Sequence, residues 1–249
     1  MSRHVALLVL AVLIAVAAAV SVWPARWLMR AVPAHAPLAV VAAEGTLWSG
    51  NATLALGRGE LQRTLPDPLR WRWSFSRGPQ MIVEHPWLAG PLIIAPSLTG
   101  IGISAQTLQL PAQALATLDA RIAAVDPDGR LIVSWPASFV GNHARPAGAQ
   151  LLKAEWRDAG SALTPVRPLG HYTLDIRQSQ GDALAITLAT QTGPLLMNGN
   201  GILDPGGRFS FDGIARADPT AGASVHAALA DVLGALGPRH NDQTQLQFR

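Results

Sequence analysis

"LRWRWSFS", residues 69–76, alternates large apolar side chains with polar ones at every position. Leu69, Trp71, Trp73 and Phe75 fall on one side of an extended chain, and Arg70, Arg72, Ser74 and Ser76 fall on the other. This period of two is typical of a β-strand with one buried and one solvated face. It favours an antiparallel sheet, because parallel sheets are covered on both faces and show continuous apolar runs.

The same alternation recurs along most of the chain. It is found in "TLWSGNATLAL" (46–56), "LLKAEWRD" (151–158), "YTLDIR" (172–177), "ALAITLA" (183–189) and "GRFSFDG" (207–213). In the last stretch Phe209 and Phe211 share a side. The sequence therefore predicts a mainly β fold built of antiparallel sheets.

Two stretches, residues 111–125 and 224–237, space their apolar residues at three and four positions, which predicts helices. A turn-rich break and another strand follow each of them. We therefore predict two similar β halves, residues 44–140 with a helix near 111–125 and residues 151–249 with a helix near 224–237. The stretch 139–150, which contains Gly, Asn and Pro, is the expected joint.

The N-terminal stretch Val5–Trp23 contains neither charge nor proline. About 19 residues at a rise of 1.5 Å per residue match the ~30 Å hydrocarbon core of a bilayer. A transmembrane anchor is predicted at 5–23, after an N-terminus of residues 1–4. The aromatic and basic residues that follow suit a headgroup layer, namely Trp23, Arg26, Trp27 and Arg30.

A cleaved signal peptide is the alternative for this segment. "AAA" at 17–19 is a candidate cleavage site, but the apolar run continues beyond it. Basic residues flank both ends of the segment about equally, so their distribution does not orient it. Residues 24–43 contain several prolines and are predicted to form an extended spacer.

Composition excludes several classes of function. Charged residues make up 14% of the chain, and the formal net charge is +3. No run of five or six like charges occurs, which argues against a nucleic-acid-binding tail. The chain has no cysteine, which excludes disulfides, thiolate nucleophiles and cysteine-ligated zinc.

No stretch carries the pattern of an enzyme or of a cofactor site. The seven histidines are dispersed without metal-ligand spacing, and Ser49 lacks the preceding glycine of a nucleophile elbow. Asp126 and Asp128 resemble a carboxylate pair, but "DPDG" predicts a turn before a strand. We expect no catalytic residue, no metal and no cofactor.

"EGTLWSGNA", residues 44–52, is predicted to open the β body. Trp48 shares parity with the apolar residues after it and is expected to point inward, with Gly50 leaving space on the same face. Ser49 is expected on the opposite face.

The order of these features resembles the N subunit family of type II secretion systems (general secretion pathway protein N). The likeness is carried by "GTLWSG", "GHYTLDI" (170–176), "LATQTGPLLMNGNGIL" (188–203) and "GRFSFDGIARA" (207–217). The motif residues that we single out are Gly45, Thr46, Leu47, Trp48, Gly50, Gly193, Pro194, Leu195, Gly199, Gly201, Phe211 and Gly213.

The resemblance implies a single-pass protein of the bacterial inner membrane, with a cytoplasmic N-terminus and a periplasmic β body. It implies an accessory role in the export of folded proteins across the outer membrane, without enzymatic activity. The implied partners are the secretin, the inner-membrane linker protein and the pseudopilins, besides the lipid bilayer and without nucleic acid.

A membrane anchor followed by one-sided strands also resembles the AsmA-type envelope proteins, whose curved sheets offer an apolar groove to lipids. Arg70, Trp71, Arg72, Trp73 and Phe75 are therefore a candidate groove or partner surface. Alternatively, the rings among them are core side chains beneath a covering helix.

Overall fold

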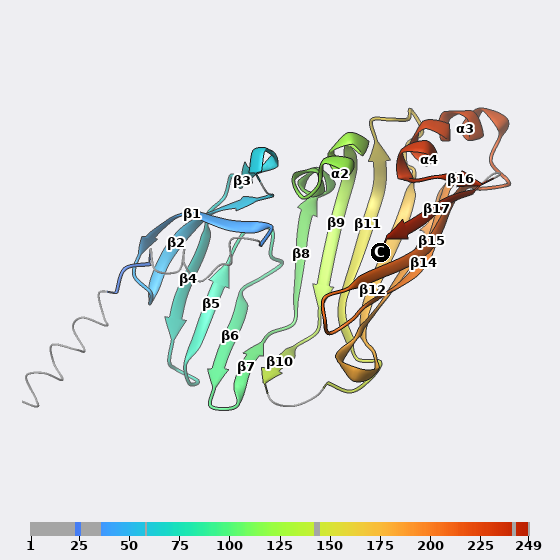
Figure 1. Ribbon diagram of the computed structural model, residues 1–249. Helices are drawn as coiled ribbons and strands as arrows, with labels where there is room; N and C mark the ends of the chain where they lie inside the picture. The colour runs from blue at the N-terminus through green and yellow to red at the C-terminus, as the bar shows by residue number, and fades with distance from the viewer. Residues whose placement is uncertain (1–22, 26–35, 58, 142–144, 241–242, 249) are drawn as a thin grey trace, which may run out of the picture.

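The computed structural model describes residues 23–25, 36–57, 59–141, 145–240 and 243–248. All strand pairing between the named strands is antiparallel, and the strands form two sheets, which confirms the predicted mainly β fold (Figure 1). Of the predicted anchor Val5–Trp23, only Trp23 is among these residues. Within the part of the chain that the structure describes, no helix combines the length and apolarity needed to cross a membrane.

The first sheet has eight strands in the order β1-β2-β4-β5-β6-β7-β10, with β3 paired to β2. Their bounds are β1 Leu38–Gly45, β2 Ser49–Leu56, β3 Arg63–Thr64, β4 Leu69–Ser74, β5 Gln80–Glu84, β6 Leu92–Ser97, β7 Gly100–Ile103 and β10 Ser138–Gly141. β1 begins at Leu38, inside the range predicted as spacer. The prolines that suggest a spacer end at Pro37, and the apolar stretch after it pairs with β2.

The second sheet has nine strands in the order β16-β17-β15-β14-β13-β12-β11-β9-β8. Their bounds are β8 Gln106–Pro111, β9 Pro127–Trp135, β11 Gln150–Ser161, β12 Gly170–Gln178, β13 Leu184–Thr192, β14 Leu195–Leu203, β15 Phe209–Ala217, β16 Arg239–His240 and β17 Gln243–Phe248. β8 and β9 belong to this sheet, although they lie in the range predicted as the first half. The sheets thus divide the chain differently from the predicted halves.

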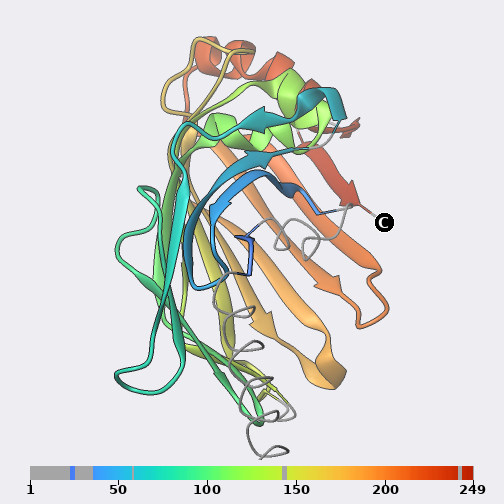
Figure 2. The same cartoon turned by 90° about the vertical axis from the view of Figure 1, so that its left-hand side faces the viewer.

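The two sheets meet at β8, and Figures 1 and 2 show them as one curved wall. The loop between β5 and β6 forms a bridge to β8 between Leu88 and Leu108. Two backbone hydrogen bonds flank this bridge, from Ala89 N to Thr107 O at 2.9 Å and from Gln109 N to Trp87 O at 2.7 Å. The loop therefore ties the first sheet to the edge of the second.

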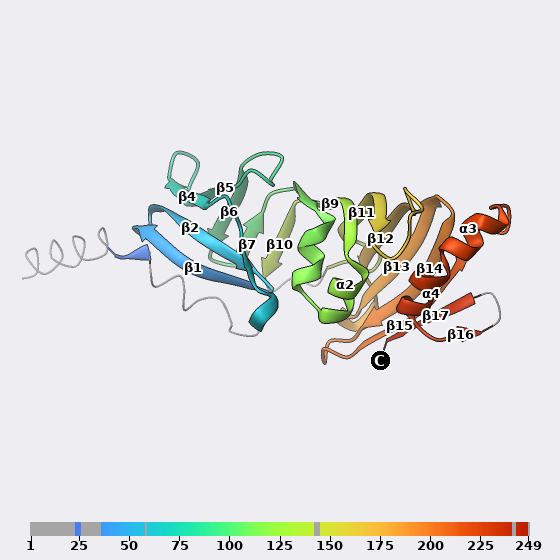
Figure 3. The ribbon, with the colours of Figure 1, turned by 90° about the horizontal axis from the view of Figure 1, so that it is seen from above.

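The named helices within the described residues are short. They are the 3₁₀ helices η2 Gly59–Leu61, η3 Ala112–Thr117 and η4 Gln180–Asp182, and the α-helices α2 Ala120–Val125, α3 Ala223–Ala228 and α4 Ala230–Leu236. Both predicted helical stretches are helical, but each is broken in two. Both helical stretches pack against the second sheet. η3 packs on β9, and α4 packs on β15 and β17 (Figure 3).

Two apolar clusters form the core. The larger lies between α4 and one end of the second sheet, and its fully buried members include Leu195, Leu229 and Val232. The smaller lies on the first sheet around Trp71, with Ala25, Ala52, Leu54 and Val83. None of the helices η2, η3, η4, α2, α3 and α4 contributes a buried residue to this smaller cluster.

Candidate functional site

The stretch Gly45–Gly50 is a tight turn between β1 and β2. Thr46 closes it, because its backbone N–H donates to Ser49 O at 2.9 Å while its Oγ1 accepts from the N–H groups of Trp48 and Ser49. Gly45 has a φ of +90°, and a Cβ there would lie 2.6 Å from Ser49 O. This conformation favours glycine. Threonine and glycine in this stretch therefore shape a turn.

The turn also holds Trp71 in place. The indole Nε1 of Trp71 donates to Leu47 O at 3.2 Å, and the ring lies against Gly50. A Cβ on Gly50 would lie 2.7 Å from Trp71 Cζ2 and would also meet the carbonyl oxygen of Glu44. The space at Gly50 was predicted for a bulge or a close neighbouring backbone; the backbone of Glu44 does come close, and the ring of Trp71 lies there as well.

Trp48, Trp73 and Phe75 form an aromatic cluster at this end of the first sheet. Their ring centroids lie 6.0 Å apart for Trp48 and Trp73 and 6.2 Å apart for the other two pairs. Trp71 is 5% exposed, whereas Trp48 and Trp73 are half-buried and Phe75 is 62% exposed. Trp71 therefore belongs to the core, and the rings beyond it approach the surface.

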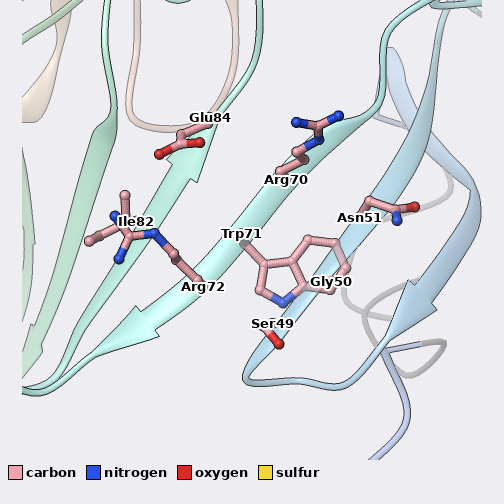
Figure 4. Close-up of a pocket in the computed structure, with 8 residues that line it drawn as sticks. All are labelled: Ser49, Gly50, Asn51, Arg70, Trp71, Arg72, Ile82 and Glu84. Carbon is pink, nitrogen blue, oxygen red and sulfur yellow. The ribbon is translucent and has the colours of Figure 1, made fainter.

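A shallow depression of about 300 Å³ lies beside the turn (Figure 4). Its lining comes from β2, β4 and β5 and comprises Ser49, Gly50, Asn51, Arg70, Trp71, Arg72, Ile82 and Glu84. Ser49 lies opposite Arg72 in the strand pairing, and Arg70 lies opposite Glu84. The lining thus holds one serine hydroxyl, two exposed arginines and a single carboxylate, Glu84.

Asp126 and Asp128, which resemble a carboxylate pair in the sequence, are also structural. β9 begins at Pro127, so Pro127, Asp128 and Gly129 lie in a strand and the predicted DPDG turn is wrong. Asp126, just before the strand, has a φ of +45°. The backbone N–H of Gly129 holds the pKa of Asp128 below its usual range, with hydrogen bonds from Arg167 and Gln113 acting in the same sense. Across the described residues, no group of three or more His, Asp or Glu side chains could hold a metal ion.

The second motif, "GPLLMNGNG", builds the core of the second sheet. Gly193 has a φ of +125°, and a Cβ there would lie 2.6 Å from Leu169 O. Pro194 O accepts from Asp218 N at 2.8 Å. Leu195 is buried, and its carbonyl accepts from the hydroxyl of Tyr172 at 2.9 Å.

Tyr172 is a structural residue that the sequence did not single out. Its hydroxyl also donates to Leu169 O at 3.1 Å, so it lies between the two segments that meet at Gly193. Burial raises the pKa of Tyr172, which keeps the hydroxyl protonated as a donor. It is the single tyrosine of the chain and lies on the apolar parity of "YTLDIR", a signal that could have revealed it.

Three glycines of the motifs form a seat for one aromatic ring. Cβ atoms on Gly199, Gly201 and Gly213 would lie 2.6, 2.8 and 2.9 Å from ring atoms of Phe211. Phe209 and Phe248 flank this ring, with centroids 6.3 and 6.2 Å away. The predicted common side of Phe209 and Phe211 is confirmed, and the glycines allow Phe211 to lie flat on the sheet.

Charged residues line the polar face of the second sheet, opposite the face that carries the larger core cluster. Glu155 accepts from Lys153 Nζ at 2.9 Å and from Arg157 Nη2 at 2.6 Å. The hydrogen bond from Lys153, and then that from Arg157, lowers the pKa of Glu155. These three residues lie at alternate positions of β11, so one carboxylate joins two cations in a surface network.

Comparison with known proteins agrees with the predicted resemblance. The family model described as type II secretion system (T2SS), protein N, matches residues 36–249. Type II secretion system protein N of Klebsiella pneumoniae is 28% identical over 239 residues, which cover 91% of this chain and 86% of the relative. No solved structure matches the chain. Since the family match includes nearly the whole β body, the chain belongs to the type II secretion system protein N family.

Proposed function

We propose that this protein is an accessory inner-membrane component of a type II secretion system that supports the export of folded proteins through protein–protein contacts. The uncharged segment Val5–Trp23 anchors it, with the N-terminus in the cytoplasm and the β body in the periplasm. The partners that we propose are the secretin, the inner-membrane linker and the pseudopilins. Membership of the protein N family supports a role in a type II secretion system. The edge of the first sheet supports contact with partners by strand addition.

The open edge of β1 is the observation that carries this proposal. Within the described residues β1 has a strand partner on one side only, β2. Its sequence, LAVVAAEG, contains a single charge and neither lysine nor proline, the residues that usually protect an edge. The β-bulge between Val40 and Ala42 is the one such protective feature in β1; Val41 there is 50% exposed, and Ala42 to Gly45 pair with β2 without a further shift of register. Such an edge can accept an extended segment of a partner by strand addition.

Lysines on this edge should impair export. We expect the double substitution Val41→Lys and Ala42→Lys to weaken the partner contact about tenfold or more, which corresponds to about 1.4 kcal/mol of binding free energy. The measurement is the extracellular fraction of a type II secretion substrate in cells that carry only the variant chain.

The matched control is Ile202→Lys with Ile214→Lys, which also introduces two lysines at exposed apolar positions, on the polar face of the second sheet. This control should export normally at an equal protein level. Equal export by the edge variant and the wild type would contradict contact through β1.

An apolar row on the second sheet favours a second candidate function, lipid binding. Leu174 pairs with Ala154 on one side and with Leu188 on the other, and Ile176 pairs with Ile186. All five are half-buried. The row shares the face of Tyr172 but continues past the core cluster, which includes none of Leu174, Ile176 and Ile186. Acyl chains would match such a surface.

A photocrosslinking amino acid at Leu174 separates the two functions. Lipid binding predicts adducts of lipid mass in intact cells from position 174, and none from position 214 on the opposite face. Adducts of protein mass alone from position 174 would count against lipid binding.

A further inference from the structure

We propose that the aromatic cluster of Trp48, Trp73 and Phe75 docks on the surface of the phospholipid bilayer and holds the body of the protein against the membrane. This rests on the membrane anchor in the proposed function and adds a second, reversible membrane contact made by the folded sheet. The occupant is the interfacial layer of the bilayer, where headgroups meet acyl chains.

The position of the cluster beside the end of the apolar segment is the first argument. Trp23, the last residue of that segment, is 42% exposed and accepts a hydrogen bond through its carbonyl from Leu47 N at 2.9 Å. Pro24 forms a bridge with Thr46. The chain therefore enters the sheet at the turn that carries Trp48, and a bilayer that holds residues 5–22 lies next to this turn.

The exposure of the rings is the second argument. Phe75 stacks on Trp73 with an interplanar angle of 17°, yet it remains 62% exposed at the tip of the β4–β5 hairpin. Trp48 links the pair to the turn, because Trp73 N donates to Trp48 O at 2.8 Å. Aromatic rings that are only partly buried suit the interface between water and acyl chains, where tryptophan in particular is enriched.

Charge is the third argument. No acidic residue occurs between Asp67 and Glu84, whereas Arg70, Arg72 and Arg77 lie in that interval and are exposed. Arg70 and Arg72 face the opposite side of the sheet from Trp73 and Phe75, whereas Arg77 follows Phe75 at the hairpin tip. Arginine beside interfacial aromatic rings favours a bilayer that contains anionic phospholipid. The tip of the hairpin, residues 75–79, thus combines an exposed aromatic ring with an arginine and carries no acidic residue.

The cysteine-free chain allows a direct test by site-specific labelling. The full chain is reconstituted into vesicles of zwitterionic and anionic phospholipid after Ser76→Cys substitution and attachment of an environment-sensitive fluorophore. Ser210→Cys is the matched control, since it is also exposed but lies in β15 of the second sheet. Quenching by spin-labelled lipid is then compared at the two positions.

We expect the label at position 76 to lose most of its emission to the spin-labelled lipid and the label at position 210 to lose little. Adding Phe75→Asp to the Ser76→Cys chain should abolish the quenching at 76 while the chain stays in the vesicles through alkaline washing. Equal, weak quenching at both positions in a wash-resistant chain would overturn the docking but leave the anchor intact. A chain that alkaline washing removes would overturn the anchor, and one that never binds the vesicles would overturn both.

Discussion

Replacing Trp71 by alanine is expected to lower the free energy of unfolding by about 3–5 kcal/mol. The ring is 5% exposed, lies against Gly50 and packs with Ala25, Ala52 and Val83 at the centre of the smaller core cluster. Its removal leaves a cavity, and it leaves Leu47 O without the indole donor that ties the turn to β4. Because the turn also contacts Trp23, the entry of the chain into the sheet should loosen as well.

The measurement is denaturant unfolding of the full chain in mild detergent. Unfolding is monitored by circular dichroism, because the substitution removes a fluorescent tryptophan. Phe75→Ala is the control, because this ring is exposed and its removal should change the free energy of unfolding by about 0.5 kcal/mol or less. Comparable losses for the two variants would show that Trp71 is not the core residue of this sheet. In cells, a loss of this size should also lower the amount of protein and hence export.

Gly199→Ala is expected to cost about 1–3 kcal/mol, although it adds a single methyl group. The new Cβ would lie 2.6 Å from Phe211 Cζ, 2.8 Å from Gly213 Cα and 2.9 Å from Asp212 O. Two of these contacts are with backbone, so moving the ring alone cannot relieve them. The strands β14 and β15 would have to separate where Gly199 pairs with Gly213.

Gly206→Ala is the matched control for this change. Nothing lies within 4 Å of a Cβ at that position, so the same substitution should be close to neutral. Thermal unfolding of the two variants, measured side by side, gives the difference directly. Equal melting temperatures would contradict the role of Gly199 as part of the seat for Phe211.

Local patterns predicted the faces of the strands well. In β4, Trp71 is buried between the exposed Arg70 and Arg72, as the alternation indicates. Parity, however, says which side a residue faces and not what covers it. Trp71, Trp73 and Phe75 share one side, yet they range from core to surface, because burial depends on neighbours that come from other parts of the chain.

The glycine-rich motifs illustrate the same limit. Their order along the sequence predicted the family, and Gly50 was expected to leave room for a bulge or a close neighbouring backbone. That the ring of Trp71 also lies against Gly50, and that three glycines surround the ring of Phe211, depends on the pairing of β2 with β4 and of β14 with β15. Pairing partners and register are set by contacts distant in sequence, which local periodicity does not encode.

By itself, the sequence determined the β class, the one-sided faces, the positions of the helical stretches and the resemblance to the family, because these depend on local periodicity and motif order. Only the tertiary structure decided that β8 and β9 join the second sheet while β10 returns to the first, and that β1 is an edge strand among the described residues. The physical reason is that every one-sided strand offers the same backbone hydrogen-bonding groups. The choice among partners therefore rests on side-chain packing across the whole fold.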